Sequence, residues 1–354
     1  MTLSMRASVA DRGLDVELDL GSRERVAILG PNGAGKSTTL SVLAGLLRPD
    51  RGRAELDGRV LFDLDGQRRS WLPPHARGIV LMAQDPLLFP HLSVLENVAF
   101  GPRSAGGGVR RARALARTWL EEVGAAELAD RRPRQLSGGQ AQLVAIARAL
   151  TADPRLLLLD EPLASLDVAA APGVRQVLRR VLTDRAAVIV THDLLDALLL
   201  ATRVVVLDGG TVVESGATAD VLRHPQTPFT ARIAGLNLVR GTAAPRGVRQ
   251  PNGHVIEGLA RTPTTVGEPA VAVFSPSAVS VFRSPPHGSP RNTIEVTITE
   301  LEPRGDQVRV RAVSRSDQVL AADVTAPAVS ELELQPGAGV CYSIKASAVT
   351  VYPG

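Results

Sequence analysis

The sequence predicts an α/β core with a helical subdomain, followed by a smaller all-β domain. A glycine-rich turn, Gly30–Thr38, stands between an apolar run that ends at Leu29 and an amphipathic segment. Two further runs, within 155–162 and 186–193, are uniformly apolar, which is typical of strands buried in a parallel sheet. After about Phe229 helical periodicity ends, and short β-type runs alternate with proline and glycine turns.

The composition is that of a globular protein with two or three domains. The 354 residues are 44% hydrophobic and 21% charged, and no stretch reaches the roughly 18 uninterrupted apolar residues of a membrane span. The N-terminus lacks the order of a secretory signal, and a single cysteine, Cys341, cannot form an internal disulfide. We therefore expect a soluble cytoplasmic protein. Its basic run at 109–117 is typical of a solvated helix face rather than of a nucleic-acid site.

The local patterns suggest where the domains begin and end. Residues 1–30 have the alternation of short strands, 203–216 that of a hairpin with a Gly-Gly turn, and 115–125 that of an amphipathic helix. We expect the α/β domain over 1–230, with its helical subdomain at about 86–150. Residues 231–287 are then a linker and β-rich connecting segment, and 288–354 form a small barrel.

The glycine-rich turn has the pattern G-x-x-x-x-G-K-[ST] between a strand and a helix, the context that a phosphate-binding loop requires. Its glycines allow the backbone to turn tightly and to point N–H groups at phosphate oxygens. Lys36 is expected to reach the β- and γ-phosphates, and Ser37 to bind Mg²⁺. The candidate nucleotide residues are Gly30, Pro31, Asn32, Gly33, Ala34, Gly35, Lys36, Ser37 and Thr38. This pattern indicates a P-loop NTPase core without saying which NTPase.

The strand RLLLLDEP supplies two carboxylates for the same site. Asp160, at the end of the strand, is expected to hold Mg²⁺ directly or through water, and Glu161 to polarise the attacking water. An apolar strand that ends in Asp-Glu is also compatible with a strand followed by a capped helix. The phosphate loop upstream favours the metal site.

The stretch LSGGQ, residues 136–140, predicts a second anion-binding turn at a helix N-terminus, made by the Ser137 hydroxyl and the Gly138 and Gly139 amides. With this stretch the sequence resembles the ATP-binding cassette (ABC) ATPases. The resemblance implies that two chains pack head to tail. Ser137, Gly138, Gly139 and Gln140 of each chain would then cap the ATP bound by the other.

The resemblance covers about 230 residues and implies further roles. Gln84, in LMAQDP, would contact Mg²⁺, the water and a membrane partner, and residues 165–167 would cross the dimer interface. His192, in VTHD, would contact the γ-phosphate and orient the water of Glu161. A lone histidine at a strand end is usually structural, but its distance from the Asp-Glu pair favours the functional interpretation. The implied catalytic residues are Glu161, His192, Lys36 and Gln84, and the implied metal site consists of Ser37, Gln84 and Asp160.

Two positions depart from the family pattern. The family usually stacks adenine on an aromatic residue before the phosphate loop, but residues 1–29 contain no Phe, Tyr or Trp. Arg12 stands near the expected place and could stack through its planar guanidinium. The helix after LSGGQ commonly carries an arginine where this chain has Leu143, so one contact of that helix differs.

Three features indicate an importer. A single cassette implies a homodimer, and the lack of a span implies a separate permease dimer. The stretch 85–101 also resembles importer ATPases, with Leu87, Leu88 and Phe89 placed where a permease would dock. The same residues are equally compatible with the core of the helical subdomain. The β-rich extension resembles the regulatory domain of importer ATPases.

The C-terminal residues indicate the cargo. GSPRNTIEVTITEL and YSIKASAVTVY resemble the molbindin-like OB-type domain, in which two turns bind an oxyanion. The matching residues are Ser289, Arg291, Asn292, Lys345, Ala346 and Ser347. Two cations, hydroxyls and backbone N–H groups suit a tetrahedral dianion. The only two lysines of the chain, Lys36 and Lys345, both fall at proposed oxyanion sites. The alternative is a transport-associated barrel that binds no ligand.

These observations lead to one main hypothesis. We expect a peripheral ATPase on the cytoplasmic face of the membrane that uses ATP and Mg²⁺ to drive uptake of molybdate or tungstate. An extracytoplasmic binding protein would deliver the anion, and molybdate could also bind the C-terminal domain as a regulatory ligand. The nearest alternative is the same machine for sulfate or another oxyanion. A soluble non-transport ABC ATPase predicts fused cassettes or a coiled-coil insertion, neither of which the sequence contains, so no nucleic-acid partner is expected.

Overall fold

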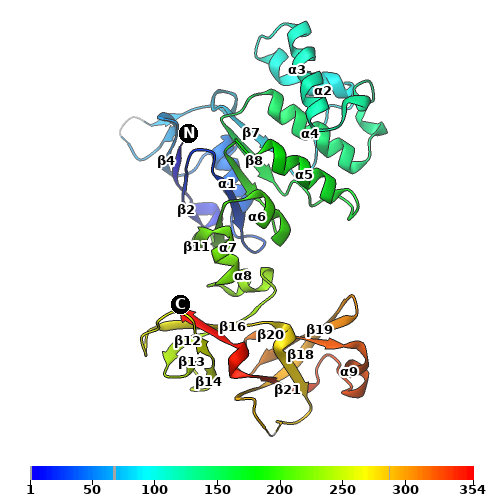
Figure 1. The fold of residues 1–354 in the computed structure, drawn as a ribbon. Coiled ribbons are helices and arrows are strands. Elements are labelled where there is room, and N and C mark those ends of the chain that lie inside the picture. The colour runs from blue at the N-terminus through cyan, green and yellow to red at the C-terminus, as the bar shows by residue number, and fades with distance from the viewer. Residues whose placement is uncertain (1, 67–68, 287) are drawn as a thin grey trace. The chain divides into compact units, whose positions relative to one another are not determined.

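The computed structural model describes residues 2–66, 69–286 and 288–354. The chain divides into two compact units, 1–219 and 220–354, each with its own sheets (Figure 1). No helix in the described ranges is long and apolar enough to cross a membrane.

The first unit begins with an antiparallel sheet of strand order β2-β1-β4-β5-β6. Burial alternates residue by residue along β1 and β2, so one face packs into the core and the other carries exposed polar residues. The strands expected within residues 1–30 are thereby confirmed. The strands are β1 (Leu3–Val9), β2 (Leu14–Leu20), β4 (Arg51–Leu56), β5 (Arg59–Asp63) and β6 (Ser70–Trp71).

A second sheet, of order β11-β10-β3-β9-β8-β7, forms the centre of the unit. Its strands are parallel except β11, which forms the predicted hairpin with β10. The uniformly apolar runs are its buried inner strands, as predicted. The strands are β3 (Arg25–Leu29), β7 (Ile79–Met82), β8 (Leu156–Asp160), β9 (Ala187–Val190), β10 (Arg203–Asp208) and β11 (Thr211–Ala217).

Helices complete the unit. α1 (Lys36–Ala44) follows the glycine-rich turn, and α5 (Ala171–Val181) and α6 (Leu194–Leu200) follow β8 and β9. α7 (Thr218–Arg223) follows β11 and spans the boundary between the two units. Three helices group together as a helical subdomain (Figure 1). They are α2 (Val94–Ser104), α3 (Val109–Glu122) and α4 (Gly138–Thr151), and they share one apolar core with the inner strands.

In its described residues the second unit contains the end of α7, the helices α8 (Pro228–Ile233) and α9 (Ala326–Glu331), and two sheets. The first sheet contains β12 (Asn237–Ala244), β13 (Gly247–Arg249), β14 (Val255–Glu257), β15 (Leu259–Ala260), β16 (Pro269–Phe274) and β22 (Thr350–Pro353). The second contains β17 (Val279–Phe282), β18 (Asn292–Arg304), β19 (Gln307–Ser314), β20 (Val319–Thr325) and β21 (Gly339–Ile344). One hydrophobic core joins both sheets.

These two sheets repeat one plan. Their orders, β14-β13-β12-β16-β22 and β20-β19-β18-β21-β17, correspond strand for strand. The segments AVFSPSAVSVF (272–282) and YSIKASAVTVY (342–352) align residue by residue, and each forms a strand, a 3₁₀ turn and a strand. β17 pairs with β21, while β22 pairs with β16, so each sheet takes one strand from the other half of the unit.

This exchange corrects the expected domain boundaries. Residues 231–287 were expected to connect two domains, but β12, β13, β14, β16 and β17 are integral strands of the second unit, and this unit begins at Asp220 rather than after residue 230. The physical reason is that strands of 231–287 pair with strands of 288–354. The second partner of β16 is β22, and the partner of β17 is β21. One position of the expected linker, His287, lies outside the described residues.

Candidate nucleotide and oxyanion sites

Four loops of the first unit meet at one edge of its parallel sheet. β3, β9, β8 and β7 are consecutive neighbours and point the same way, so their carboxyl ends share that edge. The glycine-rich turn follows β3, His192 follows β9, Asp160 and Glu161 end β8, and Gln84 follows β7. Open α/β sheets bind ligands at this edge.

The phosphate loop needs glycine at two points. Gly30 has φ +151°, and a Cβ there would lie 2.2 Å from the Leu207 carbonyl oxygen. Gly35 has φ +97°, and its Cβ would lie 2.5 Å from the Leu14 side chain. Gly35 is also the N-cap of α1, so the free N–H groups of the first turn of this helix belong to the loop.

Lys36 is buried inside the loop, with 8% of its surface exposed. Its Nζ donates hydrogen bonds to the carbonyl oxygens of Gly30 (2.8 Å) and Pro31 (2.9 Å). Burial lowers the pKa of Lys36, and the charges of Glu161 and Asp160 oppose that shift. The loop thus holds a cation whose charge is poorly solvated, which strengthens its attraction for phosphate.

Ser37 and Asp160, two of the residues expected to hold Mg²⁺, are in contact with each other. The Ser37 hydroxyl donates to Asp160 Oδ1 at 3.3 Å. Burial raises the pKa of Asp160, and the bond from Ser37 opposes that shift. One hydroxyl and one carboxylate suit Mg²⁺, which typically takes few protein ligands and completes its shell with water and substrate phosphates. The described residues contain no cluster of three or more His, Cys, Asp or Glu side chains that would form a more complete protein site.

Glu161 and His192 are brought together across β8 and β9. His192 Nδ1 lies 3.3 Å from Glu161 Oε2. Glu161 adopts φ +46°, unusual for a residue with a side chain, and its N–H donates to the Val190 carbonyl at 2.9 Å. Such a conformation costs about 1–3 kcal/mol and persists where the surrounding structure imposes it. The carboxylate is therefore held in a defined position at the sheet edge.

The LSGGQ stretch, residues 136–140, lies at the start of α4, with Ser137 as the N-cap. The Ser137 hydroxyl accepts from the Gln140 N–H (3.3 Å), and the Gln140 side chain accepts from the Ser137 N–H (3.0 Å). This reciprocal capping orders the helix N-terminus. Gly139 is also required by packing, because a Cβ there would lie 3.0 Å from that of Ala170. An ordered N-terminus with small residues is suited to an anion brought by a second chain.

The two positions that depart from the family pattern are explained in part. Arg12 is exposed at the end of a short 3₁₀ turn, and its Nη1 lies 3.3 Å from the Thr38 hydroxyl, which places the guanidinium beside the phosphate-loop helix. Leu143 packs against the core of the helical subdomain.

Gln84, which was expected to contact Mg²⁺ and the water, is exposed, two residues beyond β7.

Sequence reasoning missed two polar residues that shape residues 86–93, the buried Asn97 and the half-buried Arg148. The Asn97 side chain exchanges hydrogen bonds with the backbone of Phe89, and Arg148 donates to the carbonyls of Pro86 (2.7 Å) and Leu87 (2.8 Å). Leu87 is 67% exposed, whereas Leu88 packs on the subdomain core. The proposed docking residues thus include both exposed and core positions. A polar residue on an otherwise apolar helical face was the signal available for Asn97.

In the second unit the register brings the two predicted cations together. Asn292 pairs with Ile344, so Arg291 and Lys345 are the residues directly beyond the last pair of β18 and β21. Arg291 and Lys345 are exposed, as are Ser289 and Ser347, while Ala346 is half-buried at the start of a 3₁₀ turn. We name Arg291, Lys345, Ser289 and Ser347 the basic corner.

Asn292 does not belong with this set. It is fully buried, its Oδ1 accepts from the Glu257 N–H (2.7 Å), and its Nδ2 donates to the Glu257 carbonyl (2.8 Å). The equivalent residue of the other half, Asn237, makes the same two bonds to Ala321. The prediction of an anion ligand is therefore corrected, because the polar atoms of Asn292 already join β18 to β14.

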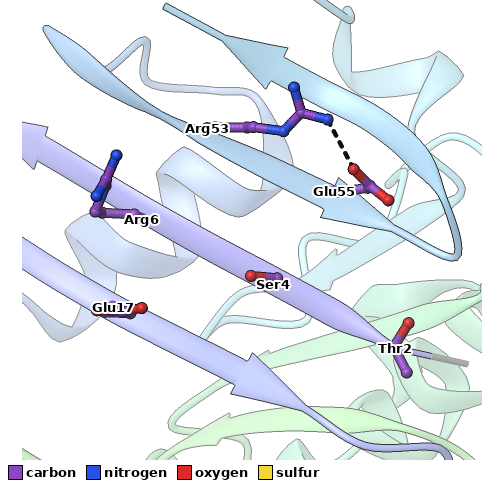
Figure 2. Close-up of a pocket in the computed structure, with 6 residues that line it drawn as sticks. All are labelled: Thr2, Ser4, Arg6, Glu17, Arg53 and Glu55. Atoms are coloured by element: carbon purple, nitrogen blue, oxygen red, sulfur yellow. Dashed lines mark hydrogen bonds and ion pairs between the residues drawn. The ribbon is translucent and has the colours of Figure 1, made fainter. Parts of the chain in front are cut away.

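One surface hollow lies apart from the predicted residues. It has a volume of about 320 Å³ on the exposed face of β1, β2 and β4. Figure 2 shows the ion pair of Arg53 and Glu55 (2.9 Å), and Arg53 also pairs with Asp63 (2.7 Å). Because these charges compensate one another, the hollow has the character of a solvated sheet face. Its lining residues are Thr2, Ser4, Arg6, Glu17, Arg53 and Glu55.

Comparison with known proteins agrees with this geometry. Residues 14–164 match the family described as ABC transporter, and residues 288–351 match the TOBE domain. The chain is 52% identical to the molybdenum import ATP-binding protein ModC of Mycobacterium tuberculosis, over 99% of this chain and 97% of the relative. It is 33% identical to the molybdate/tungstate import ATP-binding protein WtpC of Pyrococcus horikoshii, over 96% and 95%.

A solved structure of a cassette protein matches part of the chain. A dimeric ATP-binding cassette in a post-hydrolysis state, bound to ADP and Pi, is 29% identical with a TM-score of 0.53, and covers 62% of this chain and 99% of its own. The phosphate loop, the paired Ser37 and Asp160, the contact of Glu161 with His192, and the near full-length relative lead to one assignment. The chain belongs to the ABC transporter family of ATP-binding proteins.

Proposed function

We propose that the chain is the ATP-hydrolysing subunit of an importer for molybdate or tungstate that acts through a separate permease. The observation that carries the ATPase part is the meeting of the phosphate loop, Asp160, Glu161 and His192 at one sheet edge. The cargo part is supported by the basic corner and by two relatives that match nearly the whole chain, both of which are named as import proteins for molybdenum or for molybdate and tungstate.

The roles of the residues in hydrolysis follow from their positions. The loop amides and Lys36 bind the phosphates, and Mg²⁺ held by Ser37 and Asp160 would neutralise their charge. Glu161 is the acceptor that orients and polarises the attacking water. His192, in contact with Glu161, holds that carboxylate and the γ-phosphate in register. Gln84, on the neighbouring strand, joins the magnesium and water side of the same site.

Hydrolysis requires two chains in this proposal. Within one chain the capped start of α4 is an anion-binding turn, formed by Ser137, Gly138, Gly139 and Gln140. The phosphate that it binds would come from another molecule. A second chain, packed head to tail, would supply the ATP. Arg12 would contribute to adenine binding through its guanidinium plane. The dimeric cassette among the similar structures supports this arrangement.

The permease would dock on residues 86–89. Leu87 is exposed with φ +43°, and Arg148 donates to the carbonyl groups of Pro86 and Leu87. An apolar side chain presented from a fixed backbone is suited to receive a helix of a membrane partner. The chain would then work at the cytoplasmic face of the membrane. The permease dimer and an extracytoplasmic binding protein would supply the transport path and the cargo.

The basic corner would bind molybdate as a regulatory ligand. Arg291 offers a planar fork and Lys345 a mobile ammonium, and the Ser289 and Ser347 hydroxyls with the Ala346 amide add neutral donors. Because all of these groups except Ala346 are exposed, affinity depends on how many reach the anion at once. Sulfate has the same charge and a smaller radius, so the same corner distinguishes the anions only through the spacing of its donors.

Calorimetry on the full chain tests this site. Titration with molybdate should release heat, tungstate should behave alike, and sulfate should bind more weakly. Lys345→Ala and Arg291→Ala should each weaken molybdate by about tenfold, whereas Arg315→Ala, at an exposed arginine of the same unit paired with Glu295, should not. Equal heat with sulfate, or no heat with molybdate, would remove the support for the cargo. The ATPase assignment is tested separately by Glu161→Gln, which should abolish turnover and trap an ATP-bound dimer visible by size exclusion.

A further inference from the structure

Arg77 is buried to an extent that is rare for a charged residue. Only 1% of its surface is exposed, and it is the bulkiest fully buried side chain among the described residues. Burial lowers the pKa of Arg77 to about 10, so it remains a cation at neutral pH. Removing a guanidinium from water is costly unless its surroundings replace the lost solvation.

The surroundings are carbonyl oxygens and aromatic rings. Nε donates to the Leu72 carbonyl (2.8 Å), and Nη1 donates to the carbonyls of Val42 (2.8 Å) and Leu43 (2.9 Å). The guanidinium also lies 4.3 Å from the ring centre of Trp71, a favourable cation–π distance. Within the described part of the chain Nη2 has no hydrogen-bond partner. Every bond that Arg77 makes is therefore directed to backbone or ring, and none to a carboxylate.

Two of the three carbonyls belong to the last turn of α1, whose first residue is Lys36. A helix carries partial negative charge at its carboxyl end and partial positive charge at its amino end, where this helix presents the phosphate loop. Arg77 thus places a full positive charge at one end of a nine-residue helix whose other end is built for an anion. The positive charge of Arg77 at the carboxyl end and a phosphate at the amino end therefore both interact favourably with the helix dipole.

The sequence makes room for this contact. Gly45, the C-cap of α1, has φ +82°, and a Cβ there would lie 2.6 Å from Arg77 Nε. Any side chain at this position would push the guanidinium away from the helix end. The glycine therefore serves both the left-handed backbone and the close approach of Arg77.

Arg77 also joins three parts of the unit. Trp71 belongs to β6 of the antiparallel sheet, and the carbonyls of Val42 and Leu43 belong to α1. Arg77 itself stands two residues before β7, the strand that leads to Gln84. A single side chain therefore connects the carboxyl end of α1 to β6 of the antiparallel sheet and to the segment that leads into β7.

We propose that Arg77 is a positioning residue for ATP binding: by holding the carboxyl end of α1, it sets where the opposite end presents the phosphate loop. Lys36, Ser37 and the loop amides touch the nucleotide, and Arg77 acts through them. Since a displaced loop binds ground state and transition state equally poorly, the effect should appear in KM more than in kcat.

The test compares Arg77→Lys with wild type as purified full-length protein. Lysine keeps the charge but cannot bond three carbonyls in one plane or stack as arginine does. We expect KM for ATP to rise about tenfold and kcat to change by less than about threefold. ADP affinity, measured by calorimetry, should fall in parallel with the rise in KM. The melting temperature is measured on the same sample.

Three results decide the outcome. A folded Arg77→Lys protein with a lower melting temperature but wild-type KM and ADP affinity would mean that Arg77 only stabilises the fold, and would overturn the proposal. If Arg77→Lys does not fold, Trp71→Leu takes its place, because it removes the stacking and keeps the arginine. A raised KM then supports the proposal and a wild-type KM refutes it. Arg53→Lys is the matched control, at a half-exposed arginine of the sheet that contains Trp71 (Figure 2). It should change neither KM nor the melting temperature.

Discussion

Asn292 is the residue at which an experiment can best distinguish an anion ligand from a residue that stabilises the fold. Its two hydrogen bonds to Glu257 join β18 of one half of the second unit to β14 of the other. Asn292→Ala removes both bonds, each worth about 1 kcal/mol, and leaves a partly buried N–H and carbonyl unpaired at about 1–3 kcal/mol each where water does not reach. Because Glu257 is half-buried, water reaches its freed groups in part, and we expect a loss of about 2–5 kcal/mol of unfolding free energy.

Scanning calorimetry of the full chain measures this loss. In a unit of this size, 2–5 kcal/mol corresponds to a melting temperature lower by roughly 5–15 °C. Only the transition of the second unit should move, because Asn292 and Glu257 both lie in it. Asn237→Ala is the matched control: it breaks the equivalent pair of bonds to Ala321, and should lower the same transition by a similar amount.

Molybdate titration on the same variants supplies the refuting result. At a temperature where the second unit is folded, Asn292→Ala should bind molybdate with nearly wild-type affinity, as should Asn237→Ala. If instead Asn292→Ala melts like wild type and loses affinity tenfold, Asn292 is an anion ligand, and its assignment to the interior would be wrong.

Three further predictions concern single side chains. Gly35→Ala forces an unfavourable φ and a 2.5 Å contact, so ADP binding measured by calorimetry should be lost, and retained affinity would contradict the loop geometry. Arg12→Ala should weaken ATP binding several-fold by removing the guanidinium beside Thr38; unchanged affinity would show that adenine is held elsewhere. Burial raises the pKa of the Tyr342 phenol above its ordinary value of 10. Above about pH 10 the unfolded chain releases a proton that the folded state keeps, so the free energy of unfolding falls as pH rises. Tyr342→Phe loses the bond to the Val310 carbonyl, about 1 kcal/mol at neutral pH, and urea unfolding from pH 9 to 11 should show a shallower decline; an equal decline would exclude Tyr342 as its source.

The nucleotide site could be predicted because its parts are local. The phosphate loop, the pair Asp160–Glu161 and His192 each follow an apolar run that is recognisable by itself. Parallel strands bring such loop positions to one edge whatever the details of packing. The contact between His192 and Glu161 thus follows from strand order alone, once β8 and β9 are neighbours.

The remaining features depend on contacts between distant segments. Asn292 stands in a family motif beside Arg291, and only its pairing with Glu257 shows that its side chain points inward. Arg77 sits in a polar loop, where an arginine is ordinarily solvated. The exchange of β17 and β22 is likewise invisible to local periodicity, since a strand of either half has the same alternation whichever sheet it joins.

That exchange has a consequence for synthesis on the ribosome. β22 lies between β16 and β15 in its sheet, so β16 emerges long before the neighbour that covers its edge. Until residues 350–353 leave the exit tunnel, this sheet has an open edge and its core lacks Val351 and Tyr352. A stop codon at position 350 would delete an interior strand of this sheet, and we expect the released chain to aggregate or be degraded.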